Sequence, residues 1–291
     1  ITKKHKEEMW EFLKKYLNLT EKTYKNEQDL IKSIRQADMY CTGSDQVWNV
    51  EWNEKIERPF FLDFVPDDKI RFAYAASFGR KKIEEWEKEE TTRMLKKYRD
   101  IAMRELSGVE ILHDLGLEGI NVLDPTLLLN RQDWMKIASN KYQNKKYILM
   151  YNLNRNKKID YYVQKLAKEK DLDIYYITYS LHEIYKKGKM KCNIKVEDFL
   201  ALMANAEYVV TDSFHATAFS INFNKQFMIV FPEKFSTRVE SILKITGLES
   251  RIVKDYKDIS LANETIDFNE ANKKLEEQRR LANEYINKAV R

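Results

Sequence analysis

Short apolar runs alternate with longer amphipathic stretches along most of the chain. In its first part, the runs predict strands, and the stretches, with apolar positions three and four residues apart, predict helices. The predicted strands are at 38–41, 70–76, 100–103 and 120–123, and the predicted helices are at 6–17, 27–36, 82–98 and 109–115. Strands that alternate with helices are typical of a parallel sheet, so we expect an α/β domain here.

The same alternation starts afresh after residues 130–145, a polar segment that predicts a linker with one helix around Trp134. Strands are predicted at 146–153, 173–178, 206–210 and 226–231, and helices at 159–170, 197–204, 238–246 and 269–290. We therefore predict an α/β fold with three segments: an N-terminal Rossmann-like domain (1–140), a C-terminal Rossmann-like domain (141–262) and a C-terminal helix (263–291).

Composition narrows the class of protein without naming a function. Of 291 residues, 43% are hydrophobic, which is enough for packed cores. Lysine and arginine exceed aspartate and glutamate by 51 − 46 = 5, which predicts a solvated surface rather than a nucleic-acid-binding face. Cys41 and Cys192 lack metal-ligand spacing, and neither a signal peptide nor an apolar run of about 18 residues is visible. We expect a cytoplasmic protein in a reducing compartment.

Polar side chains follow each predicted strand of the first domain. The segment 42–49 is either a capped turn with Trp48 as a core anchor or a ligand-binding loop. Ser77, Arg104 and Asp124 come directly after the next three predicted strands. Open α/β sheets bind ligands at the carboxyl ends of their strands, so these positions are candidates for a site.

The segment 206–220 predicts a strand, a polar turn and a helix of small residues, with His215 at the turn. A helix that begins near Ser213 points N–H groups at an anion. A histidine there titrates near neutral pH and can donate a proton. The alternative is a buried histidine bonded to a carbonyl group. The other three histidines lie in polar or helical settings, which favours structural or surface roles.

Three charged residues are further candidates for chemistry. The Arg104 guanidinium either grips a carboxylate or phosphate in a fork, or pairs with Glu105 or another acid. Asp45 and Asp124 are either acid–base groups or caps of their loops. The sequence has no Walker A, G-x-G-x-x-G, H-E-x-x-H or G-x-S-x-G motif, and its seven glycines argue against a glycine-rich phosphate loop.

Five blocks of the sequence, in order, resemble the polysaccharide pyruvyl transferase family. The blocks are 41–49 (CTGSDQVWN), 73–79 (AYAASFG), 104–108 (RELSG), 124–129 (DPTLLL) and 211–217 (TDSFHAT). The C-terminal helix is similar as well. One such block would be weak evidence, whereas five in the right order are specific for the family and less specific for the activity.

The resemblance implies a GT-B-like arrangement of two Rossmann-type domains facing a cleft, with the acceptor on the N-terminal side and the donor anion on the C-terminal side. The implied reaction moves the pyruvyl group of phosphoenolpyruvate onto a sugar of a cell-surface polysaccharide as a cyclic ketal and releases phosphate. Phosphoenolpyruvate enters as donor substrate and no cofactor is implied. The scheme needs no metal, because cations and amide donors meet the charge. The acceptor is a sugar or lipid-linked oligosaccharide, which would bring the protein to the inner face of the membrane.

Family members place a histidine and arginines around phosphoenolpyruvate. His215 matches the histidine and Arg104 matches one arginine, so the resemblance makes both of them catalytic. Other residues of the matching blocks are expected to bind substrate: Gly43, Ser44, Asp45, Gln46, Trp48, Asn49, Ser77, Phe78, Asp124, Thr211, Asp212, Ser213, Phe214, Ala216 and Thr217.

The sequence departs from the family pattern in two places. The family histidine follows Arg-Leu, whereas Ser213 and Phe214 precede His215 here, so one anion-binding arginine is missing. Arg238 and Lys234 are the candidates to replace it. Family chains usually begin with a strand and an Asn/Gly-rich turn, which this chain lacks, so we expect the first strand of the N-terminal sheet to be either absent or outside this sequence.

Two other functions fit the same fold. A glycosyltransferase with a nucleotide-sugar donor would hold the diphosphate at the helix start, 213–216. A non-catalytic family member would bind a glycan or a biosynthetic partner and would turn over neither donor.

Overall fold

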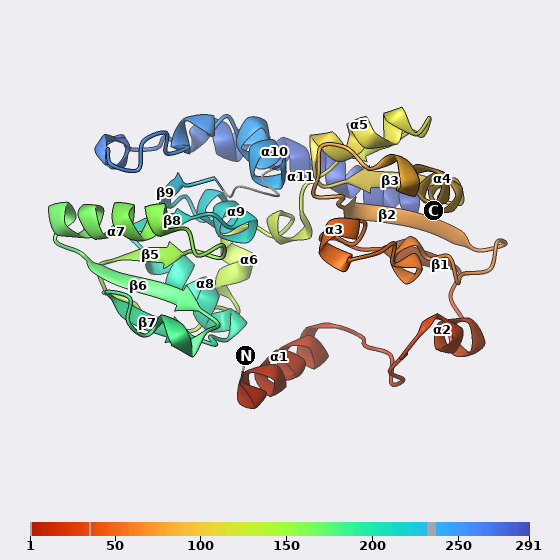
Figure 1. Ribbon diagram of the computed structural model, residues 1–291, viewed down its shortest axis with the longest axis horizontal. Coiled ribbons are helices and arrows are strands. Elements are labelled where there is room, and N and C mark those ends of the chain that lie inside the picture. The colour runs from red at the N-terminus through yellow and green to blue at the C-terminus, as the bar shows by residue number, and fades with distance from the viewer. Residues whose placement is uncertain (1, 35, 232–236) are drawn as a thin grey trace. The chain divides into compact units, whose positions relative to one another are not determined.

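The computed structural model describes residues 2–34, 36–231 and 237–291, which form two compact units, each built around its own parallel sheet (Figure 1). Unit A comprises the described residues of 20–128, 237–242 and 274–291. Unit B comprises those of 2–19, 129–231 and 243–273. The predicted α/β class with two Rossmann-type domains is confirmed.

Unit A contains a parallel sheet with the strand order β1-β2-β3-β4. The strands are β1 (Met39–Thr42), β2 (Ile70–Ala76), β3 (Asp100–Met103) and β4 (Ile120–Asn121). The helices are α2 (Glu27–Ser33), α3 (Val50–Asn53), α4 (Glu85–Leu95), α5 (Leu106–Asp114), the first part of α10 (Thr237–Thr246) and most of α11 (Asn269–Ala289). Because all four strands are parallel, their carboxyl ends lie at one edge of the sheet.

Alternate residues of β2 face two different helical layers. Phe72 and Tyr74 pack with the Ala282 and Tyr285 side chains of α11, and the Tyr285 hydroxyl donates to the carbonyl oxygen of Ala73 at 2.7 Å. The opposite face of the sheet packs with α4 and α5. This packing explains why residues 274–291 belong to unit A rather than to a separate C-terminal segment that starts at 263.

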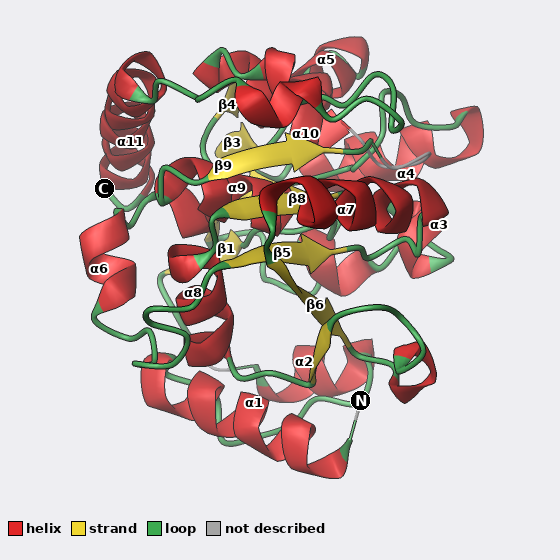
Figure 2. Cartoon of the chain, turned by 90° about the vertical axis from the view of Figure 1, so that its left-hand side faces the viewer, coloured by secondary structure: helices red, strands yellow, loops and turns green. Residues whose placement is uncertain are grey.

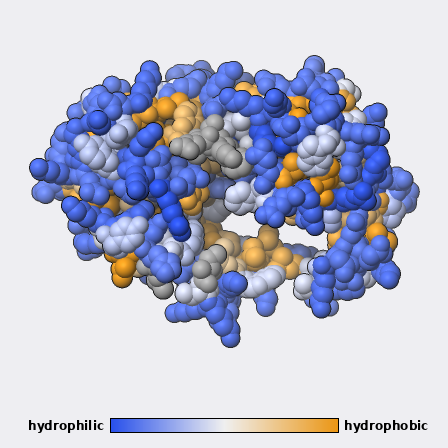
Figure 3. Space-filling view, viewed as in Figure 1, coloured by the Kyte–Doolittle hydropathy of each residue, from blue (hydrophilic) through white to orange (hydrophobic). Residues whose placement is uncertain are grey.

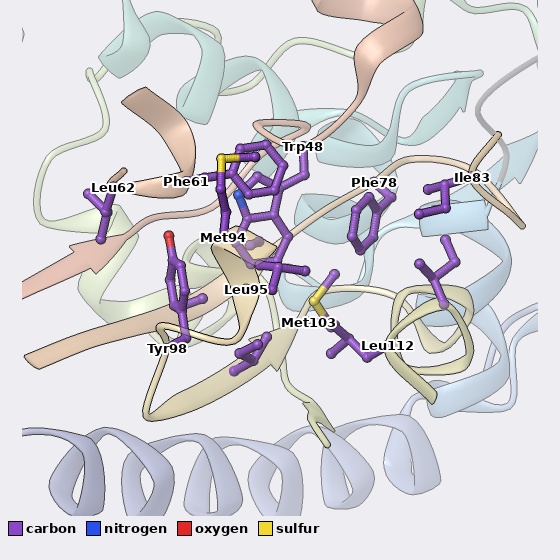
Figure 4. Packing of buried hydrophobic residues seen from close by; sticks show 14 of the residues in the cluster. Trp48, Phe61, Leu62, Phe78, Ile83, Met94, Leu95, Tyr98, Met103 and Leu112 are labelled. Carbon is purple, nitrogen blue, oxygen red and sulfur yellow. The ribbon is translucent and has the colours of Figure 1, made fainter. Parts of the chain in front are cut away.

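Trp48 is the centre of the core between the sheet and α4 (Figure 4). Its ring stacks on Phe61 with 5.4 Å between centroids and also contacts Phe78 and Tyr98. Its indole N–H donates to the carbonyl oxygen of Phe60 at 3.1 Å. Trp48 thus fixes the loop that follows β1, in agreement with the core-anchor alternative for this residue.

Unit B contains a parallel sheet with the order β7-β6-β5-β8-β9. Its strands are β5 (Tyr147–Tyr151), β6 (Asp173–Thr178), β7 (Lys189–Cys192), β8 (Tyr208–Thr211) and β9 (Gln226–Ile229). Its helices are α1 (Lys3–Tyr16), α6 (Arg131–Met135), α7 (Lys157–Lys170), α8 (Val196–Asn205), α9 (Phe214–Asn222), the second part of α10 and the start of α11.

Helices cover both faces of this second sheet (Figure 2). Four fully buried side chains of α7, three and four residues apart, pack against Ile148 and Met150 of β5. Tyr147 and Tyr151 point the other way, where the Tyr147 hydroxyl donates to the carbonyl oxygen of Leu202 in α8 at 2.8 Å. Strands buried on both faces read as continuous apolar runs, which is why β5 was recognisable from the sequence.

Three sequence predictions need correction. The strand β7 was not predicted, because its sequence Lys-Met-Lys-Cys is polar and it lies at the edge of the sheet. The helix expected at 82–98 begins only at Glu85, since Glu84 and Glu87 form a capping box at its start. Residues 2–19 group with unit B rather than with the N-terminal sheet, and Glu8 pairs with Lys195 at 3.5 Å.

Hydrophilic residues dominate the face of the molecule drawn in Figure 3, where hydrophobic side chains lie in separate patches. None of the described helices is long and apolar enough to cross a membrane.

Candidate functional site

The carboxyl ends of three strands of unit A meet at the guanidinium of Arg104, which follows β3. Its Nη1 donates to Asp124 Oδ2 at 2.9 Å and to Ser44 Oγ at 3.3 Å, and Ser44 Oγ in turn donates to Asp124 Oδ2 at 3.0 Å. Asp124 Oδ1 accepts from the N–H and hydroxyl of Thr126. Asp124 therefore both caps its loop and pairs with Arg104.

A second carboxylate and a second arginine complete this group. Arg104 Nη2 donates to Asp45 Oδ1 at 3.1 Å, and Arg238 Nη1 lies 3.7 Å from the same oxygen. We call Ser44, Asp45, Arg104, Asp124 and Arg238 the Arg104 cluster. The side chains of Arg104 and Asp124 are 1% and 2% exposed, whereas that of Asp45 is 64% exposed, so the cluster reaches solvent through Asp45.

Burial and like charge act together on Arg238. Burial, and to a smaller extent the neighbouring Arg104 charge, lower the pKa of its guanidinium to about 10, against the opposing effect of Asp45 and Glu105. Arginine is charged at neutral pH in either case, so the cluster holds two cations close together. Two guanidinium groups in a largely desolvated place offer hydrogen-bond donors to an oxyanion, in competition with the carboxylates of Asp45 and Asp124.

Glu105 holds the neighbouring loop in place. This fully buried carboxylate accepts hydrogen bonds from the Ser77 hydroxyl and from the backbone N–H groups of Phe78 and Gly79, each within 3.0 Å. Burial raises the pKa of Glu105, and the Arg104 charge opposes that effect. The loop after β2 is therefore fixed to the residue beside Arg104.

Gly79 packs closely against the loop that follows β1. Its φ is +64°, and a Cβ atom there would lie 2.1 Å from Gln46 Oε1. The Gln46 side chain accepts a hydrogen bond from Asn49 Nδ2 at 2.8 Å, and Asn49 caps α3. Only glycine combines this backbone angle with so close an approach.

The predicted substrate-binding residues of unit A divide into two groups by exposure. Gly43 and Asp45 are exposed, and Ser44 and Gln46 are half-buried. Trp48, Asn49, Ser77 and Phe78 are at most 1% exposed. These four fix the loops around the Arg104 cluster, and their assignment to substrate binding stays a prediction.

In unit B, the turn that carries His215 lies where the order of the strands reverses. The chain passes from β5 outward to β7 and then returns to β8, on the other side of β5. In doubly wound sheets, ligands bind at the carboxyl ends of the strands on either side of this reversal. The turn after β8 therefore lies where the fold favours a ligand.

Asp212 links the two strand ends at this point. Its Oδ1 accepts from the backbone N–H of Leu153 at 2.8 Å, and its Oδ2 accepts from the backbone and side-chain N–H groups of Asn154 at 2.9 and 2.8 Å. Thr211 Oγ1 donates to the carbonyl oxygen of Tyr151 at 2.6 Å. Both side chains hold the loops together in this structure, and their predicted contact with substrate stays a prediction.

Ser213 begins α9, as the sequence predicts. Its hydroxyl accepts from the Ala216 N–H at 3.4 Å, and Thr217 donates both its N–H and its hydroxyl to the Ser213 carbonyl oxygen. Phe214 is 6% exposed and meets the His215 ring edge-on at 5.3 Å, while His215 is half-buried. A half-buried histidine in the first turn of a helix lies in the positive end of the helix dipole.

Of the two cations considered for the missing family arginine, only one falls within the described residues. Arg238 belongs to unit A and lies beside Asp45, whereas Lys234 is outside the described residues. Sequence reasoning missed Glu105 as the anchor of the loop after β2. Its position next to Arg104 gave no signal, because the partner backbone groups come from a segment 26 to 28 residues away.

The described residues also line cavities at other places in the two units. One of about 760 Å³ is at the amino ends of β3 and β4, where Tyr98 and Tyr285 contribute to its lining. Another, of about 160 Å³, is at the carboxyl ends of β5 and β6. In the part of the chain that the structure describes, no group of three or more His, Cys, Asp or Glu side chains is arranged to hold a metal ion.

Comparison with solved structures defines the class of fold. The chain is similar to the S. aureus protein MnaA in complex with UDP, with 14% identity over 89% of this chain and 76% of that one, and a TM-score of 0.52. It is similar to the UDP-GlcNAc 2-epimerase of Neisseria meningitidis bound to UDP-GlcNAc, with 13% identity over 89% and 87% of the two chains, and a TM-score of 0.52. These similarities establish a GT-B-like two-domain fold.

The family follows from the sequence rather than from the fold. The model of the polysaccharide pyruvyl transferase family matches residues 2–231, so the chain belongs to that family. No curated protein sequence matches the chain. Membership of this family indicates a transferase with a polysaccharide acceptor.

Proposed function

We propose that this protein transfers the pyruvyl group of phosphoenolpyruvate to a sugar of a cell-surface polysaccharide, forming a cyclic ketal and releasing phosphate. The observation that carries the proposal is the family match over residues 2–231, which includes every residue of the Arg104 cluster except Arg238. We assign the roles of the residues for each unit separately.

In unit A, the Arg104 cluster supplies positive charge to the donor. Phosphoenolpyruvate carries a carboxylate and a phosphate, and a guanidinium binds either group through two parallel hydrogen bonds. Arg104 is held in place by Asp124, and Arg238 adds a second cation next to it. We propose that Arg238 replaces the arginine that the family has at the position of Ser213.

In unit B, His215 is the proposed acid. The preceding Ser213 caps the helix, and the amides of the first turn of α9 together with the helix dipole favour a negative charge there. Asp212 and Thr211 keep this turn fixed to the end of β5, so the imidazole has a defined place. A fixed imidazole can protonate the donor or its departing phosphate.

The proposed reaction balances without any further reactant. The methylene carbon of phosphoenolpyruvate takes up a proton, C2 becomes cationic, and a sugar hydroxyl attacks C2. The C2–O bond to phosphate then breaks, and a second hydroxyl of the same sugar attacks C2 to close the ketal. Of the two hydroxyl protons released, one balances the proton added to the methylene carbon and the other leaves with phosphate. We propose that amides and arginines stabilise the charge that develops.

The acceptor and the place of action follow from the same proposal. A sugar on a lipid-linked oligosaccharide would bring the protein to the cytoplasmic face of the membrane as a peripheral protein, and neither nucleic acid nor a cofactor takes part. The direct test is release of inorganic phosphate from phosphoenolpyruvate against a panel of lipid-linked and nitrophenyl sugars. Turnover that requires both donor and acceptor supports the proposal, and no turnover with any acceptor sugar counts against it.

A glycosyltransferase is the second candidate, because both similar structures described above contain UDP or a UDP-sugar. In that case the first turn of α9 would hold a diphosphate. A ligand that binds only the folded state raises the melting temperature. Stabilisation by phosphoenolpyruvate but not by nucleotide sugars favours pyruvyl transfer, and the reverse result favours glycosyl transfer. Stabilisation by neither, without turnover, would indicate a non-catalytic glycan-binding member of the family.

A further inference from the structure

Asp45 differs from the other charged residues of its cluster in exposure. Its side chain is 64% exposed, whereas those of its partners Arg104 and Arg238 are 1% and 13% exposed. One oxygen of its carboxylate serves both guanidinium groups, at 3.1 and 3.7 Å. A solvent-accessible carboxylate therefore covers the charged ends of two largely buried cations.

The charges of the cluster balance in this arrangement. Two guanidinium groups face the carboxylates of Asp45 and Asp124, and the buried Glu105 carboxyl lies close by. A balanced cluster attracts an external anion weakly, because the cations already have partners. An anion that binds the arginines must therefore replace one of the two carboxylates.

An external anion cannot readily displace the Asp124 carboxylate from the cluster. Its carboxylate is 2% exposed, accepts from Arg104 and Ser44 through one oxygen, and accepts twice from Thr126 through the other. Removing it would leave a buried guanidinium without its counter-charge, which is costly. The Asp45 carboxylate, by contrast, is 64% exposed, so water can replace its ion-pair contacts at a lower cost.

The backbone of Asp45 also favours its displacement. Its φ is +83°, in the left-handed region that residues other than glycine rarely adopt. Such a conformation is strained and persists only where surrounding contacts enforce it. Contacts that hold Asp45 include its ion pairs, a hydrogen bond from the backbone N–H of Gln46 to Oδ1 at 2.8 Å, and an isolated bridge to Ala76 at the end of β2. A Cβ atom at Gly43, two residues earlier, would meet no other residue within 4 Å.

We propose that Asp45 is an internal counter-ion of Arg104 and Arg238, and that the carboxylate or phosphate group of an anionic substrate displaces it when that substrate binds. The identity of the substrate as phosphoenolpyruvate rests on the function proposed above. The displacement itself requires only that an oxyanion bind the two arginines.

The chain contains a matched pair that lacks this property. Asp67 is 79% exposed, and its Oδ1 lies 3.2 Å from Arg71 Nη2 and 3.3 Å from Lys97 Nζ. The Arg71 side chain is 2% exposed, and Lys97 keeps a second carboxylate partner, Asp63, at 3.3 Å. The other hydrogen bonds of Arg71 go to the backbone carbonyl oxygens of Leu62 and Val65, so this arginine holds a turn together. Removal of the Asp67 charge should therefore not create a site for an anion.

The experiment measures the affinity of the full chain for inorganic phosphate and for phosphoenolpyruvate by titration calorimetry. Asp45→Asn keeps the size of the side chain and removes the competing charge, so it should bind phosphate about 2–5-fold more tightly, the range expected for an exposed ion pair. Asp45→Ser, which also removes the reach of the side chain, should change affinity in the same direction. Asp67→Asn should leave affinity unchanged, and Arg238→Gln should weaken binding in both the parent and the Asp45→Asn background.

Two results would overturn the proposal: phosphate affinity in both Asp45 variants equal to or lower than that of the parent, or no phosphate binding in any of these proteins. An equal gain in Asp67→Asn would also overturn it, since the effect would then reflect net charge alone. The result is independent of the proposed reaction. Tighter phosphate binding in Asp45→Asn, together with a parent protein that releases no phosphate from phosphoenolpyruvate, would contradict pyruvyl transfer and leave the displacement intact.

Discussion

The guanidinium of Arg104 and the carboxylate of Asp124 form an ion pair of 2.9 Å between two side chains that are almost completely buried. They come from the ends of adjacent strands, β3 and β4, so the pair joins two loops of the sheet edge. Breaking a buried pair on one side leaves the other charge without compensation, and this is much more costly than losing a pair in water.

Asp124→Ala should therefore destabilise the protein by about 3–5 kcal/mol, because the Arg104 charge remains buried. The free energy of unfolding in urea measures this effect. Asp45→Ala removes the exposed carboxylate from the same arginine and should cost about 1 kcal/mol or less. Equal losses in the two variants would mean that burial does not set the strength of these pairs.

His215→Ala should lower the turnover number about 10²–10⁴-fold, the usual effect of removing one positioned acid. The measurement is phosphate release from phosphoenolpyruvate with a sugar acceptor present. The melting temperature should change little, since the ring is half-buried and leaves no large cavity when it is removed. His113→Ala, at an exposed position of α5, is the matched control and should keep the parent rate. Turnover at the parent rate in His215→Ala would exclude this histidine as the acid.

The sequence predicted most strands because the central ones are buried on both faces. β2, β3 and β6 have the predicted bounds, and their apolar runs leave little choice of structure. The edge strand β7 was missed because two lysines interrupt its apolar pattern: Lys189 is exposed, and Lys191 is half-buried, 4.4 Å from the ring centroid of Tyr175. Whether such a segment forms a strand depends on its neighbours across the sheet, and the sequence of the segment does not show them.

Part of the candidate site could also be predicted, from the parallel arrangement of the strands. Polar residues at the ends of parallel strands must share one edge, so the meeting of Ser44, Arg104 and Asp124 follows from the fold. The position of Arg238 could not be predicted in this way. It comes from α10, far along the chain, and reaches the cluster only through tertiary packing.

Gly79→Ala should destabilise unit A by about 1–3 kcal/mol, through the left-handed φ of +64° and the overlap of its Cβ with the Gln46 amide. Chemical denaturation measures the loss. Gly43→Ala is the control, since nothing lies within 4 Å of a Cβ atom there. In the Gly79→Ala protein, adding Gln46→Ala should restore the part of the lost free energy of unfolding that comes from the overlap. The part that comes from backbone strain should remain. A fully additive double variant would contradict the close contact.

Stability should also depend on pH through Asp63, a nearly buried carboxylate that Arg93 binds through two hydrogen bonds of 2.8 and 3.1 Å. The Arg93 hydrogen bonds, with Lys97, lower the pKa of Asp63 below its ordinary 3.8, so the folded state favours the ionised carboxylate. Its contribution of roughly 0.5–1 kcal/mol is complete above about pH 5 and disappears as the pH falls through the folded-state pKa. Asp63→Asn and Arg93→Gln should thus each lower the free energy of unfolding at neutral pH, and their differences from the parent should shrink together below about pH 4. Guanidinium chloride unfolding over that range measures both differences, and a deficit that stays constant to about pH 3 would mean that ionisation of Asp63 is not the source of its contribution.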